Sequence, residues 1–180
     1  MKHLKKIFSF SKEKETAHKL YRVIVEQARE VAFYRDLGVA DTFDGRFDMI
    51  TLHMVLVMRR MKNDVDQTRE LSQALFDFMF DDFDMNLREQ GIGDMGVLAR
   101  IKNLAKAFYG RLEAYDAGLS QQDDAVLSAA LERNLYMENE ATEANLATIV
   151  SYMKRESDRL EKMDISQIME GVLSFGPAPQ

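Results

Sequence analysis

The sequence has no cysteine, only two prolines and no long apolar run. Without cysteine, the chain can form no disulfide, no thiolate metal site and no cysteine nucleophile. Both prolines, Pro177 and Pro179, lie near the C-terminus, so no proline breaks a helix in residues 1–176. The longest charge-free apolar stretch, Met49–Met58, is far shorter than the roughly 20 residues that a membrane-spanning helix needs. We therefore expect no membrane span and no sulfur chemistry.

The composition predicts one all-α domain. The 180 residues are 46% hydrophobic and 30% charged, as in an ordinary globular protein, and strong helix formers such as Leu, Met, Ala and Glu are abundant. We expect a single-domain bundle of about six to seven helices in residues 15–175, between a basic N-terminal segment, 1–14, and a tail, 176–180. The net charge of −6 argues against DNA as a partner.

The most apolar helix is expected at the centre of the bundle and follows a loop at Val39–Phe43. Asp44 is its predicted N-cap, Asp48 adds negative charge to its first turn, and it ends before Asn63. The apolar residues that recur at spacings of three and four, and so share one helix face, are Phe43, Phe47, Ile50, Met54, Val57 and Met61.

Further amphipathic helices are predicted on both sides of this one. Gly91 and Gly93 close the helix before them, and Asp94 is placed to cap the next. Gly110 lies inside a predicted helix, where a close approach by a neighbouring backbone would explain it. The predicted helices cover residues 15–36, 64–90, 95–117, 123–136, 141–163 and 165–175.

Two basic regions are candidates for docking. In residues 1–14, Lys5, Lys6 and Phe8 would suit the surface of an anionic membrane, and a frayed charged terminus is the alternative. The second region is a strip on the predicted helix 95–117 that would bind RNA, anionic lipid or an acidic partner. The alternative is that this strip is neutralised within the chain by Asp77, Asp81 and Asp84. The basic strip consists of Arg100, Lys102, Lys106 and Arg111.

The candidate catalytic and metal-binding patterns are incomplete. Glu15 and His18 have the ExxH spacing of di-iron bundles, but a second such pair is missing. His53 has the surroundings of a core histidine more than of a haem ligand. Asp81, Asp82 and Asp84 form one acidic cluster, whereas magnesium diphosphate sites use opposing clusters. Without a GxSxG motif or a P-loop, we expect no enzyme, no metal and no cofactor.

Several strings resemble the ubiquinol-cytochrome c chaperone family. They occur in the family's order from near Leu20 to at least Leu119, with a weaker similarity in LERNLY at residues 131–136. None of them is a short catalytic pattern. They are YRDLGVADTFDGRFDMITLHMVLVMRRM (34–61), ALFDFMFDDFDMNLRE (74–89), GIGDMGV (91–97) and AKAFYGR (105–111).

The resemblance implies a chaperone that binds newly made cytochrome b during assembly of the bc1 complex. Mitochondrial members of the family work with a small partner protein near the ribosomal tunnel exit and hold cytochrome b while haem is inserted. This sequence lacks their long N-terminal targeting region, which fits a bacterial, cytoplasmic member that acts at the inner membrane. Contact with the ribosome and with a small partner stays open. The rival hypothesis is a bundle that holds haem or an isoprenoid.

The expected binding residues come from the family-like strings. For the client or a partner, we predict a set in which the phenylalanines either line a groove or belong to the core: Tyr34, Arg35, Asp36, Asp41, Phe43, Asp44, Arg46, Phe47, Phe80 and Phe83. For docking to the membrane or the ribosome, we predict Lys5, Lys6, Phe8, Arg100, Lys102, Lys106 and Arg111.

Overall fold

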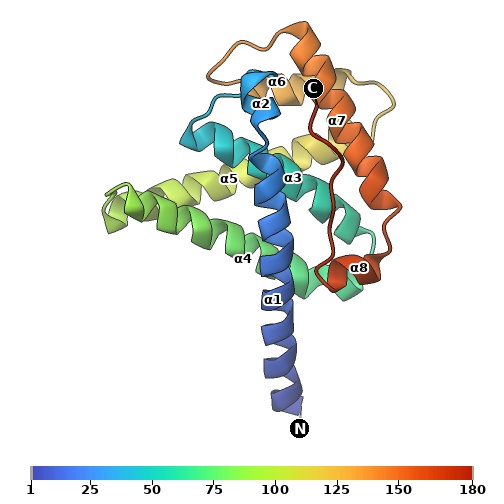
Figure 1. Ribbon diagram of the computed structural model, residues 1–180. Helices are drawn as coiled ribbons and strands as arrows, with labels where there is room; N and C mark the ends of the chain where they lie inside the picture. The colour runs from blue at the N-terminus through green and yellow to red at the C-terminus, as the bar shows by residue number, and fades with distance from the viewer. Residues whose placement is uncertain (1, 180) are drawn as a thin grey trace.

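The computed structural model describes residues 2–179, and it describes side chains from residue 12 onward. Within these residues all regular elements are α-helices, so the all-α expectation is confirmed (Figure 1). There are eight, slightly more than expected. They are α1 (Lys2–Ala28), α2 (Val31–Arg35), α3 (Phe43–Lys62), α4 (Val65–Glu89), α5 (Asp94–Leu119), α6 (Ala125–Leu135), α7 (Glu143–Glu161) and α8 (Ile165–Met169).

Helix α3 is the centre of the fold, as its apolar sequence predicted. Every side chain from Phe47 to Val57 is buried, including the polar ones. Helices α1, α4, α5, α6 and α7 all pack against it, and Figure 1 shows them around it. A helix that is apolar around most of its circumference is most stable when neighbouring helices cover every side of it.

The start of α3 differs from the prediction. Its N-cap is Thr42, whose side-chain oxygen accepts a hydrogen bond from the backbone N–H of Gly45 at 3.1 Å. Asp44 lies in the first turn instead, where the helix dipole still favours its charge. A Cβ at Gly45 would lie 1.9 Å from the carbonyl oxygen of Ala40, so the preceding loop can pass close to α3 only beside a glycine.

The first predicted helix, 15–36, is two helices in the structure. Helix α1 ends at Ala28, and α2 begins at Val31 after an extended Glu30. The break turns Phe33 into the core, where its ring lies 5.1 Å from that of Tyr152. No glycine or proline marks this break, so the packing of a distant aromatic residue decides it.

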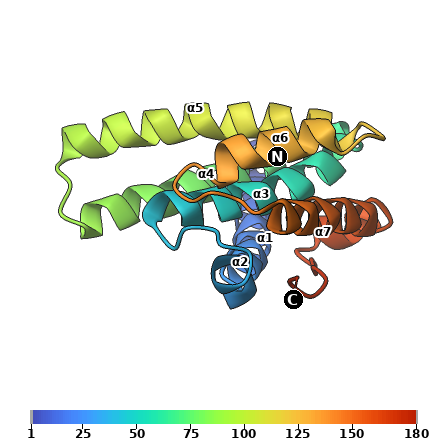
Figure 2. The ribbon, with the colours of Figure 1, turned by 90° about the horizontal axis from the view of Figure 1, so that it is seen from above.

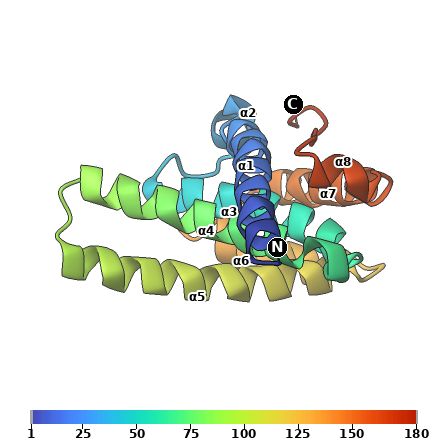
Figure 3. The same cartoon turned by 90° about the horizontal axis from the view of Figure 1, so that it is seen from below.

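Helices α4 and α5 form a long antiparallel hairpin that projects from the body (Figures 2 and 3). Gly91 has φ of +81° in the connecting turn, as expected for a glycine that closes a helix. Helix α5 begins at Asp94, and Gly93 is its N-cap, so Asp94 does not cap it as predicted. A Cβ at Gly118 would lie 2.7 Å from the Cα of Leu127. Because glycine has no Cβ, α5 and α6 can pack in close contact there. Gly110, where a close approach was expected, faces open space.

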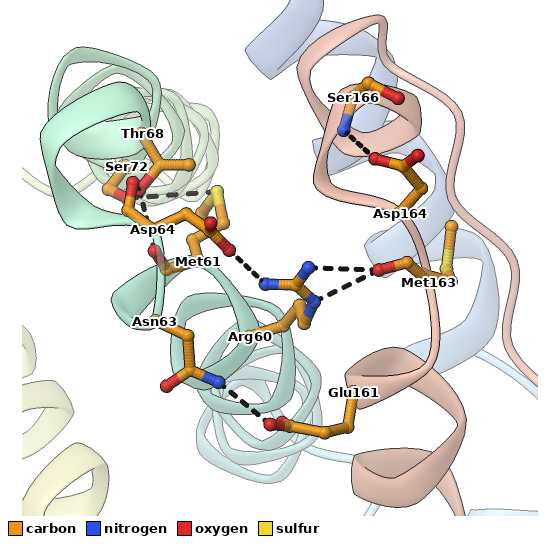
Figure 4. Close-up of polar contacts among 10 residues, drawn as sticks. All are labelled: Arg60, Met61, Asn63, Asp64, Thr68, Ser72, Glu161, Met163, Asp164 and Ser166. Atoms are coloured by element: carbon orange, nitrogen blue, oxygen red, sulfur yellow. Dashed lines mark hydrogen bonds and ion pairs between the residues drawn. The ribbon is translucent and has the colours of Figure 1, made fainter.

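The C-terminal region is tied to the rest of the chain at both ends of α8. Arg60, at the end of α3, donates to the carbonyl oxygen of Met163 from two nitrogens, at 3.2 and 3.0 Å, and to Asp64 at 2.5 Å (Figure 4). The predicted helix 165–175 ends at Met169, and the chain beyond it runs beside α7 (Figure 1). There the backbone N–H of Gly176 donates to Glu156, so the tail is held in place.

Candidate functional site

A cavity of about 380 Å³ lies at the N-terminal end of α3. Helix α5 forms its second wall, and the segment that follows α6 closes its third side. This size falls in the range of small-ligand and side-chain pockets, roughly 300–1,000 Å³. Its lining residues are Ala40, Asp44, Gly45, Phe47, Asp48, Arg100, Asn103, Leu104, Ala107, Arg111, Leu135, Met137 and Glu138.

The floor of the cavity is a buried ion pair between α3 and α5. The Nη2 atom of Arg111 lies 2.7 Å from Oδ1 of Asp48, and the two residues are only 8% and 4% exposed. Burial raises the pKa of Asp48 to about 7, and the neighbouring guanidinium offsets only part of that rise. The guanidinium also lies over the Phe47 ring, 5.4 Å from its centroid. This pair therefore places a titratable carboxyl beneath an apolar-walled opening.

A second, more exposed ion pair lies at the mouth. Arg100 of α5 pairs with Asp44 of α3, and its guanidinium lies 5.7 Å from the centroid of the Phe43 ring. On the opposite rim, Glu138 accepts a hydrogen bond from the Thr42 hydroxyl at 3.1 Å. Met137, beside it, is 71% exposed. The mouth thus combines paired charges with a large apolar side chain that faces solvent.

The polar residues predicted for client binding form a surface at the loop before α3. Arg35 pairs with Asp36 at 2.7 Å and Arg46 pairs with Asp41 at 2.7 Å, all four being exposed. The hydrogen bond from Arg46 holds the pKa of Asp41 below its usual value. Tyr34 is half-buried and donates to the carbonyl oxygen of Ala28 at 2.8 Å. These residues thus lie at the surface in two groups: Arg35 and Asp36 line a pocket beside the C-terminal segment, and Asp41 and Arg46 line another beside α4.

The predicted phenylalanines contribute mainly to the core. Phe47, Phe80 and Phe83 are buried, and Phe43 is half-buried with its ring 5.5 Å from that of Phe83. Exposing a large aromatic ring on a central helix face to water costs more free energy than exposing any other side chain, so these rings are buried. Of the two readings of these residues, core or groove, the structure places them in the core. Phe47 also lines the cavity described above, and Phe43 and Phe83 line a second pocket of about 310 Å³.

The basic strip on α5 is divided by its neighbours. Arg100 and Arg111 pair with carboxylates of α3, whereas Lys102 and Lys106 are exposed. The acidic strip of α4 does not take part in the pairs described here. Asp84 pairs with Arg88 on its own helix, and Asp77 accepts from Gln73. Neutralisation within the chain thus concerns half of the strip and comes from α3. The predicted docking residues Lys5, Lys6 and Phe8 are among those whose side chains the structure does not describe.

His53 has no nitrogen left for iron in this structure. Its Nδ1 lies 2.8 Å from the carbonyl oxygen of Met49, and its Nε2 lies 2.7 Å from the Tyr152 hydroxyl. Burial lowers its pKa to about 4, so it is neutral. Glu15 pairs with Lys19, and His18 packs on Phe78. Among the residues with described side chains, no group of three or more acidic or histidine residues could hold a metal ion.

Sequence reasoning missed the floor pair and the far rim. The sequence pattern makes Asp48 a helix-dipole charge and Arg111 a docking residue, and it indicates no site residue after Arg111. One signal was present: Asp48 lies within an apolar run, where a charged side chain needs a partner. The partner lies 63 positions further along, and no local pattern connects the two positions.

No helix in the described part of the chain is long and apolar enough to cross a membrane.

Comparisons with known proteins agree with one another. The model of the ubiquinol-cytochrome C chaperone family matches residues 35–175. The crystal structure of the Cbp3 homolog from Brucella abortus superimposes with a TM-score of 0.84 and 34% identity over 98% of this chain and 97% of that one. This likeness covers the body of the fold, the cavity included.

Curated relatives are more distant and longer. The ubiquinol-cytochrome c reductase complex assembly factor 1 of Drosophila melanogaster is 27% identical over 87% of this chain and 62% of its own length. The mitochondrial protein CBP3 of Saccharomyces cerevisiae is 28% identical over 81% of this chain and 44% of its own length. The chain thus spans between about two fifths and three fifths of the length of these relatives. It belongs to the ubiquinol-cytochrome c chaperone family.

Proposed function

We propose that this protein is an assembly chaperone of the bc1 complex that binds newly made cytochrome b. The observation that carries the proposal is the match of the family model to residues 35–175, which include α3, the cavity and α7. Relatives from several animals are named as assembly factors of ubiquinol-cytochrome c reductase. We further propose that the protein acts without catalysis and without a cofactor of its own.

The client contacts the surface around the cavity. A new membrane protein presents apolar segments with Lys and Arg at their cytoplasmic ends. The exposed Met137 offers an apolar contact for such a segment, and Glu138 and Asp41 offer carboxylates for the basic ends. A surface of this kind favours weak, reversible binding, because most of its charges already have partners within the protein. Release of the client then needs no external energy source.

Docking uses a different face. On the outer side of α5, the exposed Lys102 and Lys106 lie near the exposed Met95, Leu98 and Tyr109, which suits an anionic membrane surface. Lys5, Lys6 and Phe8 would add to this contact. Arg100 and Arg111 no longer belong to the docking set, because α3 pairs with both. We place the protein in the cytoplasm at the inner membrane, where the ribosome and a small partner protein are further candidate partners.

A photo-crosslinking experiment in cells tests the client surface. A photoreactive residue replaces Arg46 or Met137, and another replaces Asp158, an exposed residue of α7 that does not line the cavity. We expect cytochrome b adducts from positions 46 and 137 and none from 158. Deletion of the gene should lower cytochrome b and the bc1 complex together. Normal levels of both after deletion would refute the chaperone function.

A further inference from the structure

The floor of the cavity carries a buried donor that no group of the protein satisfies. Arg111 uses Nη2 for Asp48 and Nη1 for the carbonyl oxygen of Ala107 at 3.3 Å, but its Nε has no hydrogen-bond partner. Oδ1 of Asp48 has the ion-pair contact but no partner in hydrogen-bond geometry. Both residues are more than nine-tenths buried and line the cavity. An unpaired donor and an ion-paired carboxylate oxygen that can accept a further hydrogen bond therefore lie side by side at its floor.

The charges around the floor disfavour an ionic ligand. A carboxylate would meet Asp48, Asp44 and Glu138, and an ammonium group would meet Arg100 and Arg111. Arg111 is paired with Asp48 at the floor and Arg100 with Asp44 at the mouth, so neither pair leaves one sign of charge in excess. A neutral group that both donates and accepts avoids either repulsion. A hydroxyl has one oxygen for both tasks, whereas a carboxamide has a separate NH₂ for Oδ1 of Asp48 and a separate oxygen for Nε of Arg111.

The walls above the floor are apolar. Phe47, Leu104, Ala107 and Leu135 line them, and Met137 stands at the rim. Such walls suit the methylene stem of a side chain whose polar end reaches the floor. The cavity volume of about 380 Å³ accommodates a side chain together with the backbone from which it projects.

We propose that this cavity receives the carboxamide side chain of a glutamine or asparagine in the bound client polypeptide. The inference rests on the proposed function for the identity of the client, while the recognition of the carboxamide rests on the cavity alone. In the bound state the amide oxygen accepts from Nε of Arg111, and the amide NH₂ donates to Oδ1 of Asp48. The client is thereby fixed in register at one side chain.

Nuclear magnetic resonance of the full chain tests the recognition. The probe is N-acetyl-glutamine methylamide, and the comparison compounds are the corresponding glutamate and methionine derivatives, which share its backbone amides. The signal is the Nε–Hε resonance of Arg111, identified by its proximity to the Phe47 ring. We expect a saturable shift with the glutamine probe and a much smaller shift with the other two. An absent shift, or equal shifts with all three, would overturn the proposal and leave only solvent at the floor.

Variants locate the probe. Ala107→Leu fills the cavity from α5, and Asn103→Trp blocks it from an exposed position on the rim. Ala99→Leu makes the same change as the first variant on an exposed part of α5 that does not line the cavity. Both filling variants should abolish the Arg111 shift, and Ala99→Leu should retain it. A shift that persists in either correctly folded filling variant would contradict the proposed site.

The same variants in cells separate this inference from the proposed function. If Ala107→Leu and Asn103→Trp lower cytochrome b while Ala99→Leu does not, the client uses the cavity. If they bind no probe and cytochrome b stays normal, the inference about the client is wrong and the chaperone function stands. If complete deletion of the gene leaves cytochrome b normal, the chaperone function is wrong, whatever the resonance experiment gives.

Discussion

Glu156 of α7 accepts a hydrogen bond from the backbone N–H of Gly176 at 2.8 Å, across 20 residues of chain. The carboxylate is completely buried, with Arg155 at 2.8 Å and Arg159 at 3.4 Å. The Gln27 side chain donates to the carbonyl oxygen of Gly176 at 3.1 Å, so α1 holds the same residue. The C-terminal segment therefore belongs to the folded body.

Truncation after Ser174 should destabilise the protein. It removes the Gly176 donor from buried Glu156 and uncovers the ring of His53, which lies 5.1 Å from that of Phe175. We expect a loss of about 2–4 kcal/mol in the free energy of unfolding, from the unsatisfied carboxylate and the lost aromatic contact. Urea denaturation measures it. Glu156→Gln keeps an acceptor for Gly176 and should cost less; an equal loss would assign the effect to the arginine pairs.

The stability of Asp48→Asn should depend on pH differently from that of the parent chain. The pKa of Asp48 is raised to about 7, so its contribution to stability is present at low pH and lost as the pH rises through 7. His53 acts in the opposite direction: its pKa is lowered to about 4, so stability is lost as the pH falls from about 6.5 toward 4. In the parent chain the two effects largely cancel.

Without the Asp48 carboxyl, the His53 effect remains. Between pH 7 and pH 5 we expect Asp48→Asn to lose about 2 kcal/mol relative to the parent chain. Urea denaturation at several pH values provides the comparison. Arg111, Asp44 and Glu138 are the charged groups that act on Asp48. Asp158→Asn, at an exposed position of α7 that does not line the cavity, is the matched control. A constant difference between Asp48→Asn and the parent chain would contradict the raised pKa.

Two glycines of α5 should respond in opposite ways to alanine. Gly110→Ala adds a methyl group in open space within a helix and should stabilise the protein by about 0.5–1 kcal/mol. Gly118→Ala would place Cβ 2.7 Å from the Cα of Leu127, a backbone atom that cannot move alone, and should cost about 1–3 kcal/mol. Thermal unfolding of the two variants gives the signs. A destabilising Gly110→Ala would indicate a neighbour that the structure does not have.

Charge reversal on the outer face of α5 should weaken membrane docking without affecting the fold. We expect Lys102→Glu with Lys106→Glu to lower sedimentation with anionic vesicles at least tenfold, because each lysine contributes about 1 kcal/mol near such a surface. Stability should stay within about 0.5 kcal/mol of the parent chain, since both side chains are exposed. Unchanged sedimentation would remove this face from the docking proposal. Arg111→Glu, which places two carboxylates together in the interior, should unfold the protein instead.

Local sequence patterns predicted most helices because their signals are local. The apolar spacing from Phe47 to Met61 predicted α3, and Gly91 predicted the turn between α4 and α5. The break between α1 and α2 carried no such signal, because it depends on the contact of Phe33 with Tyr152. The hold on the C-terminal tail depends likewise on a carboxylate far back in the chain.

The candidate site was harder to predict for the same reason. Three residues of the predicted client set, Arg35, Asp41 and Arg46, lie at the surface as expected, and whether they bind a client stays a prediction. The cavity floor needs the side-by-side packing of α3 and α5, which brings Asp48 to Arg111. Spacing along a helix gives the face on which a residue lies. It does not say which residue of another helix lies opposite.

The position of α3 has a consequence for the dynamics of the molecule. Five helices pack against it, so solvent can reach its amide hydrogens only when most of the protein unfolds at once. Those between Met49 and Val57 should therefore exchange with deuterium at the rate of global unfolding. Any rearrangement that admits a client must leave α3 intact and occur among the segments that pack against it.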